Sequence, residues 1–276
     1  MFQHNFTKNF FLISLIFTAS LIAQSGSVEL KDSNGVFISA HSSIQEAYNA
    51  IPAAVTQAYR IEILTAYTGA NETYPITFSL KSGTSSINSI TLRPAAGNTG
   101  EIISATASGQ PILLLDDADY VIIDGRAGGI GTNPDLTFEN LGTTSGSYTF
   151  RLLNGATNNS ISYCIIKNNT MNVAGPRAIE IGTSVSNPTG NSDNLISNND
   201  IIGGRSCIGL AGTTANPNLN IHIRNNKISN FGYSGIWVLS SSSNVTIEGN
   251  EIFQTIGFNT FNFGIIAASF SALDIV

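Results

Sequence analysis

The sequence has little charge, few cysteines and few histidines, and these scarcities narrow what the protein can be. Only 11% of its 276 residues are charged, with 12 basic and 18 acidic side chains and a formal net charge of −6. Nucleic acids and anionic membrane surfaces bind clustered lysine and arginine, so neither is expected as a partner. Disorder requires low hydrophobicity together with high charge, whereas 42% of this chain is hydrophobic. We therefore expect a folded protein that owes its solubility to uncharged polar groups.

Long hydrophobic runs are also missing, except near the N-terminus. Residues 1–9 carry one lysine and no acid, and the apolar stretch Phe10–Ala23 is followed by the polar run Gln24–Ser27. This order is typical of a secretory signal peptide, and the stretch is shorter than the ~20 residues of a membrane-spanning helix. We predict a signal peptide over residues 1–23, a mature domain over residues 24–276, and secretion or cell-surface display; an uncleaved anchor is the alternative. Cleavage leaves 11 basic (12 − 1) and 18 acidic side chains, a net charge of −7, and no transmembrane segment.

What the sequence does contain is a repeat in its C-terminal half. Short apolar phrases recur 29, 28 and 29 residues apart, centred on Ile179, Ile208, Ile236 and Ile265. A fixed period of this size is typical of a solenoid, in which each coil buries its apolar face against its neighbours. Isoleucine and valine at alternate positions, interrupted by Asn and Gly, indicate short strands with tight turns. Parallel strands with crossover connections are right-handed in nearly all cases, so we expect a right-handed coil.

A second phrase in each coil places asparagine at a recurrent position. Asn199, Asn226 and Asn250 each follow an isoleucine by three residues. Asparagine tolerates the left-handed backbone of a sharp corner, and its amide can bond the equivalent amide of the next coil. We predict that these three residues adopt that conformation and form a structural ladder. An earlier copy has Cys164 at this position, where it would end the ladder with an apolar side chain.

The two cysteines do not match the repeat. Cys164 and Cys207 are 43 residues apart (207 − 164), about one and a half periods, so stacking does not bring them to the same place on adjacent coils. Each lies in an apolar strand phrase, where free cysteine behaves as a small buried hydrophobe, and disulfide geometry is strict. We expect free thiols, with a disulfide bond as the alternative.

The two ends of the repeat differ. Ser43–Glu46 is a capping box that opens a predicted helix of about ten residues, ending at Pro52 and followed by the strand Arg60–Leu64. A helix at the open end would hide the apolar stack from water, as terminal repeats must, so an N-terminal cap is predicted over about residues 41–64. At the other end, Leu273–Val276 is the start of a further phrase, cut off mid-repeat, and we expect the chain to be part of a longer protein.

The repeat continues upstream less regularly. Strands are predicted at Ser89–Arg93, Pro111–Leu115, Tyr120–Asp124 and Tyr148–Leu152. Between the last two, Gly125–Ser147 is rich in Gly, Thr and Asn, and we interpret it as a widened turn, an insertion of the kind that often lines the binding face of a solenoid. The predicted fold is therefore all-β: a right-handed parallel β-helix, or solenoid, with a short N-terminal capping helix.

Several segments resemble a known family. The opening SIQEAYNAIPAA with YRIEILTAYTGANETYPITF, the strand ITLRPA, the phrase YVIIDGR and the repeat NVTIEGNEI are similar to the pectin-lyase-like right-handed parallel β-helix superfamily, above all to its large exported bacterial members. The likeness covers residues 28–276. It implies the fold, but the superfamily includes polysaccharide lyases, hydrolases, esterases, phage tailspikes and non-catalytic adhesins, so it does not imply one activity.

The acids of the central coils are the candidates for catalysis. The superfamily's hydrolases carry Asn-Thr-Asp, Asp-Asp, Gly-His-Gly and Arg-Ile-Lys motifs, of which only Asp-Asp occurs here, at Asp116-Asp117. Glycoside cleavage needs two carboxyl groups ~5–10 Å apart, and Asp117, Asp119 and Asp124 are weak candidates for such a cluster. The favoured interpretation places them in a turn and at a strand end, where Asp bonds nearby backbone N–H groups.

The resemblance implies that a lyase of this superfamily would abstract a proton with Arg or Lys, beside acids that hold Ca²⁺. Arg126, which follows Asp124 by two residues, is the weak candidate for that base. Arg151 and Arg177 lie on later coils. The acids do not repeat in the pattern that a Ca²⁺ site requires. We therefore expect no metal and no cofactor, with Ca²⁺ as the alternative. For Arg126, the favoured interpretation is a solvated turn residue. His41 and His222 lack the context of a nucleophilic site, and His222 is expected to face solvent.

Aromatic residues interspersed with Asn and Ser suit sugar rings, and they comprise Tyr148, Phe150, Tyr233, Trp237, Phe253 and Phe261. Most of them alternate with apolar residues, and Trp237 is predicted to be core because it lies in a strand phrase. We expect an exported or cell-surface β-helix protein that is an adhesive, structural or glycan-binding scaffold, with a polysaccharide or a cell-surface glycan as its partner. The missing motifs disfavour an enzyme. The alternative is a polysaccharide lyase or glycoside hydrolase whose catalytic coils lie partly beyond residue 276.

Overall fold

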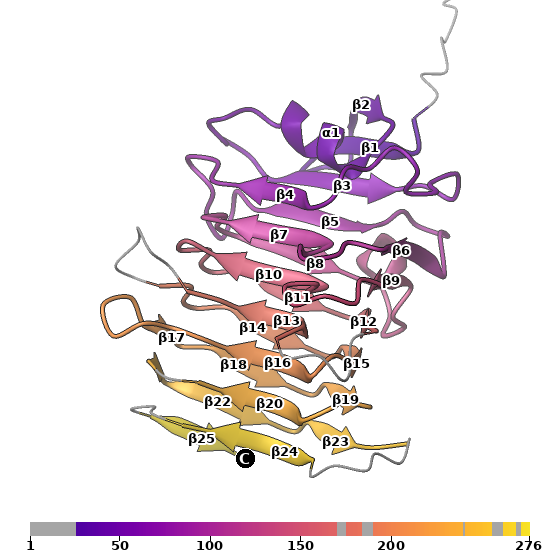
Figure 1. Cartoon of the computed structure of the whole chain (residues 1–276). Coiled ribbons are helices and arrows are strands. Elements are labelled where there is room, and N and C mark those ends of the chain that lie inside the picture. The colour runs from indigo at the N-terminus through magenta and orange to yellow at the C-terminus, as the bar shows by residue number, and fades with distance from the viewer. Residues whose placement is uncertain (1–25, 170–174, 184–189, 240, 256–261, 269–271) are drawn as a thin grey trace, which may run out of the picture.

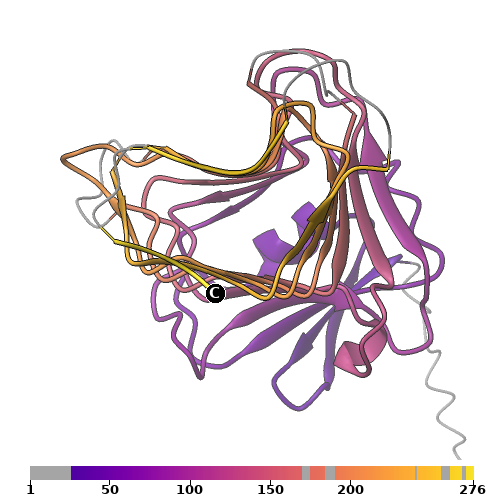
Figure 2. The same cartoon turned by 90° about the horizontal axis from the view of Figure 1, so that it is seen from below.

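The molecule is a solenoid of stacked coils. The computed structural model describes residues 26–169, 175–183, 190–239, 241–255, 262–268 and 272–276, and the predicted signal peptide lies outside them. Figure 1 shows the strands of successive coils one above another, and Figure 2 shows the same coils end on. Three long sheets of ten, seven and six strands run along the solenoid. Within the described residues, no helix has the length and hydropathy of a membrane span.

Each sheet forms one side of the coil. The ten-stranded sheet contains β1 (Val28–Asp32), β2 (Phe37–His41), β3 (Tyr59–Ile63), β5 (Ile90–Pro94), β8 (Val121–Asp124), β11 (Ser160–Ser162), β14 (Leu195–Ser197), β18 (His222–Arg224), β22 (Val245–Glu248) and β25 (Leu273–Ile275). The seven-stranded sheet contains β4 (Ile76–Ser79), β7 (Leu113–Asp116), β10 (Phe150–Leu153), β13 (Arg177–Ile181), β16 (Ser206–Leu210), β20 (Ser234–Val238) and β24 (Phe263–Ala267). The six-stranded sheet contains β6 (Glu101–Ala105), β9 (Leu136–Asn140), β12 (Cys164–Asn168), β15 (Asp200–Gly203), β19 (Lys227–Ser229) and β23 (Glu251–Phe253). A short pair of parallel strands, β17 (Asn218–Leu219) and β21 (Ser242–Ser243), lies at a corner.

The repeat predicted from the sequence sets the register of the sheets. In the seven-stranded sheet Ile179 pairs with Ile208, Ile208 with Ile236, and Ile236 with Ile265, all in parallel strands. The first three of these side chains are fully buried, and burying one such side chain stabilises the fold by about 1.5–3 kcal/mol. The last predicted phrase also forms a strand, because β25 pairs with β22 and Ile275 lies beside Ile247. The predicted parallel solenoid is confirmed.

The asparagine ladder is built at the corner between the ten-stranded and six-stranded sheets. The backbone N–H and the side-chain amide of Asn199 both donate to Oδ1 of Asn226, each at 3.0 Å. Asn226 donates in the same way to Oδ1 of Asn250, at 3.0 and 2.9 Å. On the preceding coil the backbone N–H of Cys164 donates to Oδ1 of Asn199 at 2.9 Å. Buried amides are thus hydrogen-bonded from one coil to the next, as buried polar groups must be.

One detail predicted for the ladder is wrong. The left-handed backbone belongs to the residue before each ladder asparagine, namely Asn198, Asn225 and Gly249, with φ between 55° and 60°. The chain reverses at that residue, so the following asparagine can direct its amide inward toward the next coil. The first residue of each phrase, as at Asn220 with φ 54°, makes the turn at another corner.

The N-terminal end is covered by a helix and an antiparallel hairpin. Helix α1 (Ile44–Ala50) begins at Ser43, whose side chain accepts the backbone N–H of Glu46 at 3.0 Å. Its Tyr48 ring stacks on Phe78 at a centroid distance of 4.1 Å, and Figure 2 shows α1 behind the opening of the coils. The predicted helix is confirmed. The hairpin of β1 and β2, which pairs with β3, was not predicted, because its short strands do not share the repeat.

The predicted widened turn, Gly125–Ser147, contains regular structure. It holds the 3₁₀ helix η1 (Ala127–Gly129) and the strand β9, which pairs with β6 and β12. The segment is therefore partly a coil of the solenoid. The strand β9 was not predicted because two of its buried positions are the polar residues Thr137 and Asn140. Both cysteines are free and buried, as expected, and burial raises the pKa of each thiol.

Candidate functional site

The acidic candidates of the central coils do not come together. Asp117 and Asp119 lie in the turn between β7 and β8, whereas Asp124 is the last residue of β8. The four residues of β8 correspond to about 10 Å of extended chain at ~3.3 Å per residue. The strand therefore separates Asp124 from Asp117 and Asp119, which share one turn, and the three acids do not form a single cluster.

The candidate acids and Arg126 have partners within the fold. The carboxylate of Asp119 accepts the backbone N–H and the hydroxyl of Thr157, at 2.9 and 2.6 Å. Asp124 accepts Nε and Nη2 of Arg126, both at 2.8 Å, and the same guanidinium lies 4.3 Å from the ring centroid of Tyr163. Arg126 is thus held in an ion pair and is not the solvated turn residue that we expected. Its hydrogen bonds to Asp124 raise the pKa of Arg126, the opposite of what a catalytic base requires.

The histidines and the metal-binding residue types offer no alternative centre. His222 is exposed, as expected, and Nε2 of His41 lies 2.7 Å from the hydroxyl of Ser39. In the part of the chain that the structure describes, no three His, Cys, Asp or Glu side chains are grouped as metal ligands.

The outer face of the seven-stranded sheet carries a different group of side chains. Arg151 pairs with Glu180, Glu180 with Gly209, and Gly209 with Trp237. These residues alternate along their strands with buried apolar residues, so they face outward. Trp237 is half-buried and the prediction that it is core is wrong, because it follows Ile236 and lies on the other face. We call this group the arginine–aromatic surface; it comprises Tyr148, Arg151, Arg177, Glu180, Arg205, Tyr233 and Trp237.

Each aromatic ring of the arginine–aromatic surface has a guanidinium over it. The Cζ atom of Arg151 lies 5.0 Å from the ring centroid of Tyr148, and that of Arg205 lies 4.7 and 5.3 Å from those of Tyr233 and Trp237. Such contacts contribute about 0.5–1 kcal/mol at exposed sites. The rings therefore hold arginines in place, and guanidinium groups are a large part of what this surface presents.

Arg177 crosses the surface through a gap that Gly209 leaves. A Cβ atom on Gly209 would overlap Cδ and Nε of Arg177, so a glycine is required for the arginine to lie there. The guanidinium binds the carboxylate of Glu180 on one side and lies 5.4 Å from the ring centroid of Trp237. The side chains of Arg177 and Glu180 are only 11% and 7% exposed. Arg177 therefore forms an ion pair largely removed from water.

Glu180 is the single carboxylate of this surface. Burial raises the pKa of Glu180, and this effect outweighs the opposite influence of Arg177 and Arg151. Burial also raises the pKa of Tyr148. With three arginines and one glutamate the surface carries a charge of +2 (3 − 1), in a chain whose net charge is −6.

The other two arginines are not neutralised. The described residues include every Asp and Glu of the chain, and within them neither Arg151 nor Arg205 forms an ion pair. Nε of Arg151 is buried and has no hydrogen-bond partner among the same residues. The surface therefore presents two cationic groups that a negatively charged ligand can bind.

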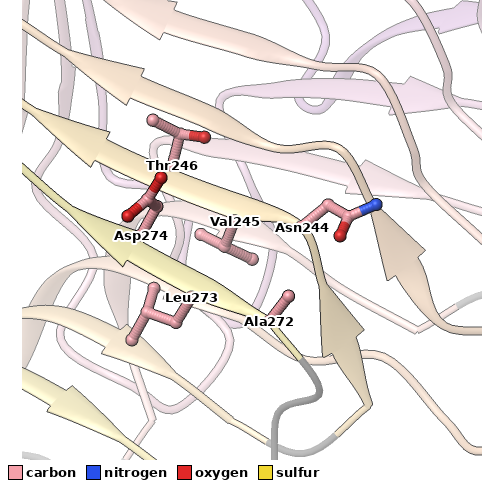
Figure 3. A pocket seen from close by; sticks show the side chains of 6 residues that line it. All are labelled: Asn244, Val245, Thr246, Ala272, Leu273 and Asp274. Carbon is pink, nitrogen blue, oxygen red and sulfur yellow. The ribbon is translucent and has the colours of Figure 1, made fainter.

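A pocket elsewhere does not match this chemistry. Figure 3 shows side chains of β22, β25 and the residues before them. They line a pocket of about 310 Å³ and comprise Asn244, Val245, Thr246, Ala272, Leu273 and Asp274. It belongs to the ten-stranded sheet and contains one carboxylate, that of Asp274. Glycoside cleavage needs two carboxyl groups, so this pocket lacks the groups for that reaction.

Sequence reasoning singled out Tyr148, Tyr233 and Trp237 but missed Glu180 and Arg205. Tyr233 follows Arg205 by 28 residues (233 − 205), which is one repeat period. A search for arginines one period from an aromatic residue could have found that pair. Phe150 is buried in the core, Phe253 is half-buried, and Phe261 lies outside the described residues.

One family model matches the chain. It is described as "Right handed beta helix region" and matches residues 105–275, more than half of the sequence. Among curated proteins and solved structures, nothing matches the chain.

Proposed function

Since the chain belongs to the right-handed β-helix family, we propose that it is a β-helix scaffold whose arginine–aromatic surface binds glycans that carry carboxylate or sulfate groups. The observation that carries the proposal is the presence of Arg151 and Arg205 without carboxylate partners, each stacked on an aromatic ring. Guanidinium groups bind carboxylate and sulfate-like anions through paired hydrogen bonds. The amphipathic rings beside them add apolar contact for a sugar.

The shape of the surface supports an extended ligand. Its residues lie on or beside four neighbouring strands, β10, β13, β16 and β20. At ~4.8 Å between strands these span about 14 Å, the length of a few sugar units. A linear polymer that runs along the solenoid would therefore meet both free arginines. Nucleic acid is a poor alternative because the chain's net charge is −6, and polyanion binding of that kind relies on many basic groups.

The proposed location is outside the cell or on its surface. The support is the sequence of residues 1–23, with its polar start and apolar stretch, which is typical of a signal peptide. Cell fractionation of a full-length protein with and without residues 1–23 tests this part of the proposal, and retention of both forms inside the cell would contradict it.

Binding is tested with three ligands that share one backbone: dextran sulfate, carboxymethyl-dextran and uncharged dextran. We expect the two charged polymers to bind and dextran not to bind, in titration calorimetry at low salt. Arg205→Ala should weaken binding about 10- to 100-fold, since a charge-assisted hydrogen bond contributes ~1.5–3 kcal/mol. Arg224→Ala is the matched control, because Arg224 is an exposed arginine on the ten-stranded sheet.

Equal effects of Arg205→Ala and Arg224→Ala would contradict the assignment of the site. The alternative function, a polysaccharide lyase or glycoside hydrolase, predicts a different result. An acidic polysaccharide incubated with the protein would then release reducing ends with time. That result would show that the protein is an enzyme and would contradict the proposed scaffold.

A further inference from the structure

The arginine–aromatic surface holds one group that opposes its own charge. Glu180 faces outward from the middle of the surface, on the strand between those of Arg151 and Gly209. Its carboxylate binds Nη1 of Arg177. Among the seven residues of this surface Glu180 is the one acidic side chain, so its carboxylate reduces the positive charge that a ligand meets.

The backbone around Glu180 is arranged so that this ion pair forms. Arg177 lies three residues before Glu180 on the same strand, and its side chain passes over Gly209 of the next coil. The ring centroid of Trp237 lies 5.4 Å from Cζ of Arg177. Glu180, the gap at Gly209 and the indole together define the position of Arg177. The charge of Arg177 is consequently directed at Glu180, whereas Arg151 and Arg205 have no such partner.

We propose that Glu180 is a specificity-determining residue of the arginine–aromatic surface: by binding Arg177 it limits the surface to two available positive charges, and so weakens its binding of densely charged glycans. This inference rests on the proposed function. It makes Glu180 an internal competitor for the anionic groups of a ligand. Neutralising Glu180 should increase the charge of the surface from +2 (3 − 1) to +3.

The same reasoning predicts a dependence on pH. The charged and titratable side chains that face Glu180 are Arg177 on its own strand, Arg151 on β10, and Tyr148 before β10; Gly209 on β16 adds none. Burial raises the pKa of Glu180, so the carboxylate takes up a proton as the pH falls toward that raised value. Arginine and a sulfated ligand keep their charges throughout. Binding of a sulfated ligand should therefore strengthen on acidification.

The experiment compares wild type with Glu180→Gln, using dextran sulfate as the probe. Glutamine retains the shape and an acceptor for Arg177 but removes the charge. Two unit charges ~8 Å apart interact with an energy of ~0.5 kcal/mol at an effective dielectric constant of ~80 and ~2 kcal/mol at ~20. This is the range of repulsion that a ligand sulfate would lose when Glu180 is neutralised. We therefore expect Glu180→Gln to bind about 2- to 30-fold more tightly than wild type near pH ~7.5. Circular dichroism and thermal melting check that the variant is folded.

The pH profile of wild type is a second measurement that requires no variant. Between about pH 7.5 and about pH 4.5, wild type should gain affinity and approach Glu180→Gln, whose own profile shows only the smaller contribution of titrating histidines. If wild type binds dextran sulfate but the two proteins have equal affinities and parallel pH profiles, the role of Glu180 is overturned and the binding site stands. If wild type does not bind the charged polymers at all, the proposed function and this inference both fail.

Discussion

The outer faces of the ten-stranded and seven-stranded sheets contain charged groups in opposite arrangements. On the ten-stranded sheet, Glu62 lies between Lys31 and Arg93 and binds both. On the seven-stranded sheet, Glu180 binds Arg177, whereas Arg151 and Arg205 form no ion pair with any of the described residues. Matched charges cancel at short range, whereas unmatched ones produce a field that extends to a ligand. One solenoid thus uses ion pairs to hold its coils together on one side and leaves positive charge available on another.

Glu62 and Glu180 are both buried, but their pKa values shift in opposite directions. For Glu62, burial acts to raise the pKa, but hydrogen bonds from Lys31 and Arg93 outweigh it and the pKa is lowered. For Glu180, burial dominates over Arg177 and Arg151 and the pKa is raised. The carboxylate form is therefore favoured on the ten-stranded sheet and disfavoured on the seven-stranded sheet.

The largest expected effect comes from filling the gap at Gly209. Gly209→Ala places a Cβ atom against Cδ and Nε of Arg177, and such overpacking costs about 1–3 kcal/mol. We expect the free energy of unfolding to fall by that amount in urea titrations. Gly264→Ala is the matched control, because it also lies in a strand of the same sheet and its Cβ atom would meet no atom within 4 Å.

A fall of the same size in both alanine variants would contradict this prediction, since it would trace the loss to the backbone and not to Arg177. A fall in Gly209→Ala alone supports the packing of the arginine across the gap.

The pH dependence of stability should separate the two glutamates. Because its pKa is lowered, Glu62 stabilises the fold above its unfolded pKa of ~4.3, and this contribution is lost as the pH falls through the folded value. Glu62→Gln should therefore lower the free energy of unfolding by about 1–2 kcal/mol near neutral pH and by less in acid.

Glu180→Gln should give the opposite trend. Because the pKa of Glu180 is raised, its contribution is complete below the unfolded value and is lost as the pH rises through the folded one. Relative to wild type, Glu180→Gln should gain stability between about pH 4 and about pH 7. Urea titrations at several pH values measure both differences. If the two variants changed in stability with pH in the same direction, the opposite pKa shifts of Glu62 and Glu180 would be contradicted.

The smallest effect is expected for Asp124→Asn on the ten-stranded sheet. Its ion pair with Arg126 is partly exposed, and such pairs contribute about 0–1 kcal/mol. The affinity for dextran sulfate should not change, because Asp124 is not part of the arginine–aromatic surface. If Asp124→Asn lost affinity for dextran sulfate in calorimetry, the binding site would have to lie on the ten-stranded sheet and not on the arginine–aromatic surface.

The recurrent isoleucines could be placed from the sequence because their burial depends on spacing alone. The position one period after Ile208 must lie beside it in a stack, and the structure has Ile236 there. Trp237 was misplaced because an apolar side chain was assigned to the core without regard to the alternation of the strand. The left-handed residues Asn198 and Asn225 were assigned one position late, since the turn residue and the ladder asparagine are adjacent in sequence.

By itself the sequence determined the period, the inward column of isoleucines and the ladder of asparagines, because each depends on contact with an equivalent residue one coil away. Only the tertiary structure decided how the outward side chains meet. Arg177 reaches Glu180 by crossing a glycine on the next coil, and Arg205 lies over rings one coil further on. Those contacts depend on side-chain directions and on an absent Cβ atom, which no spacing in the sequence specifies.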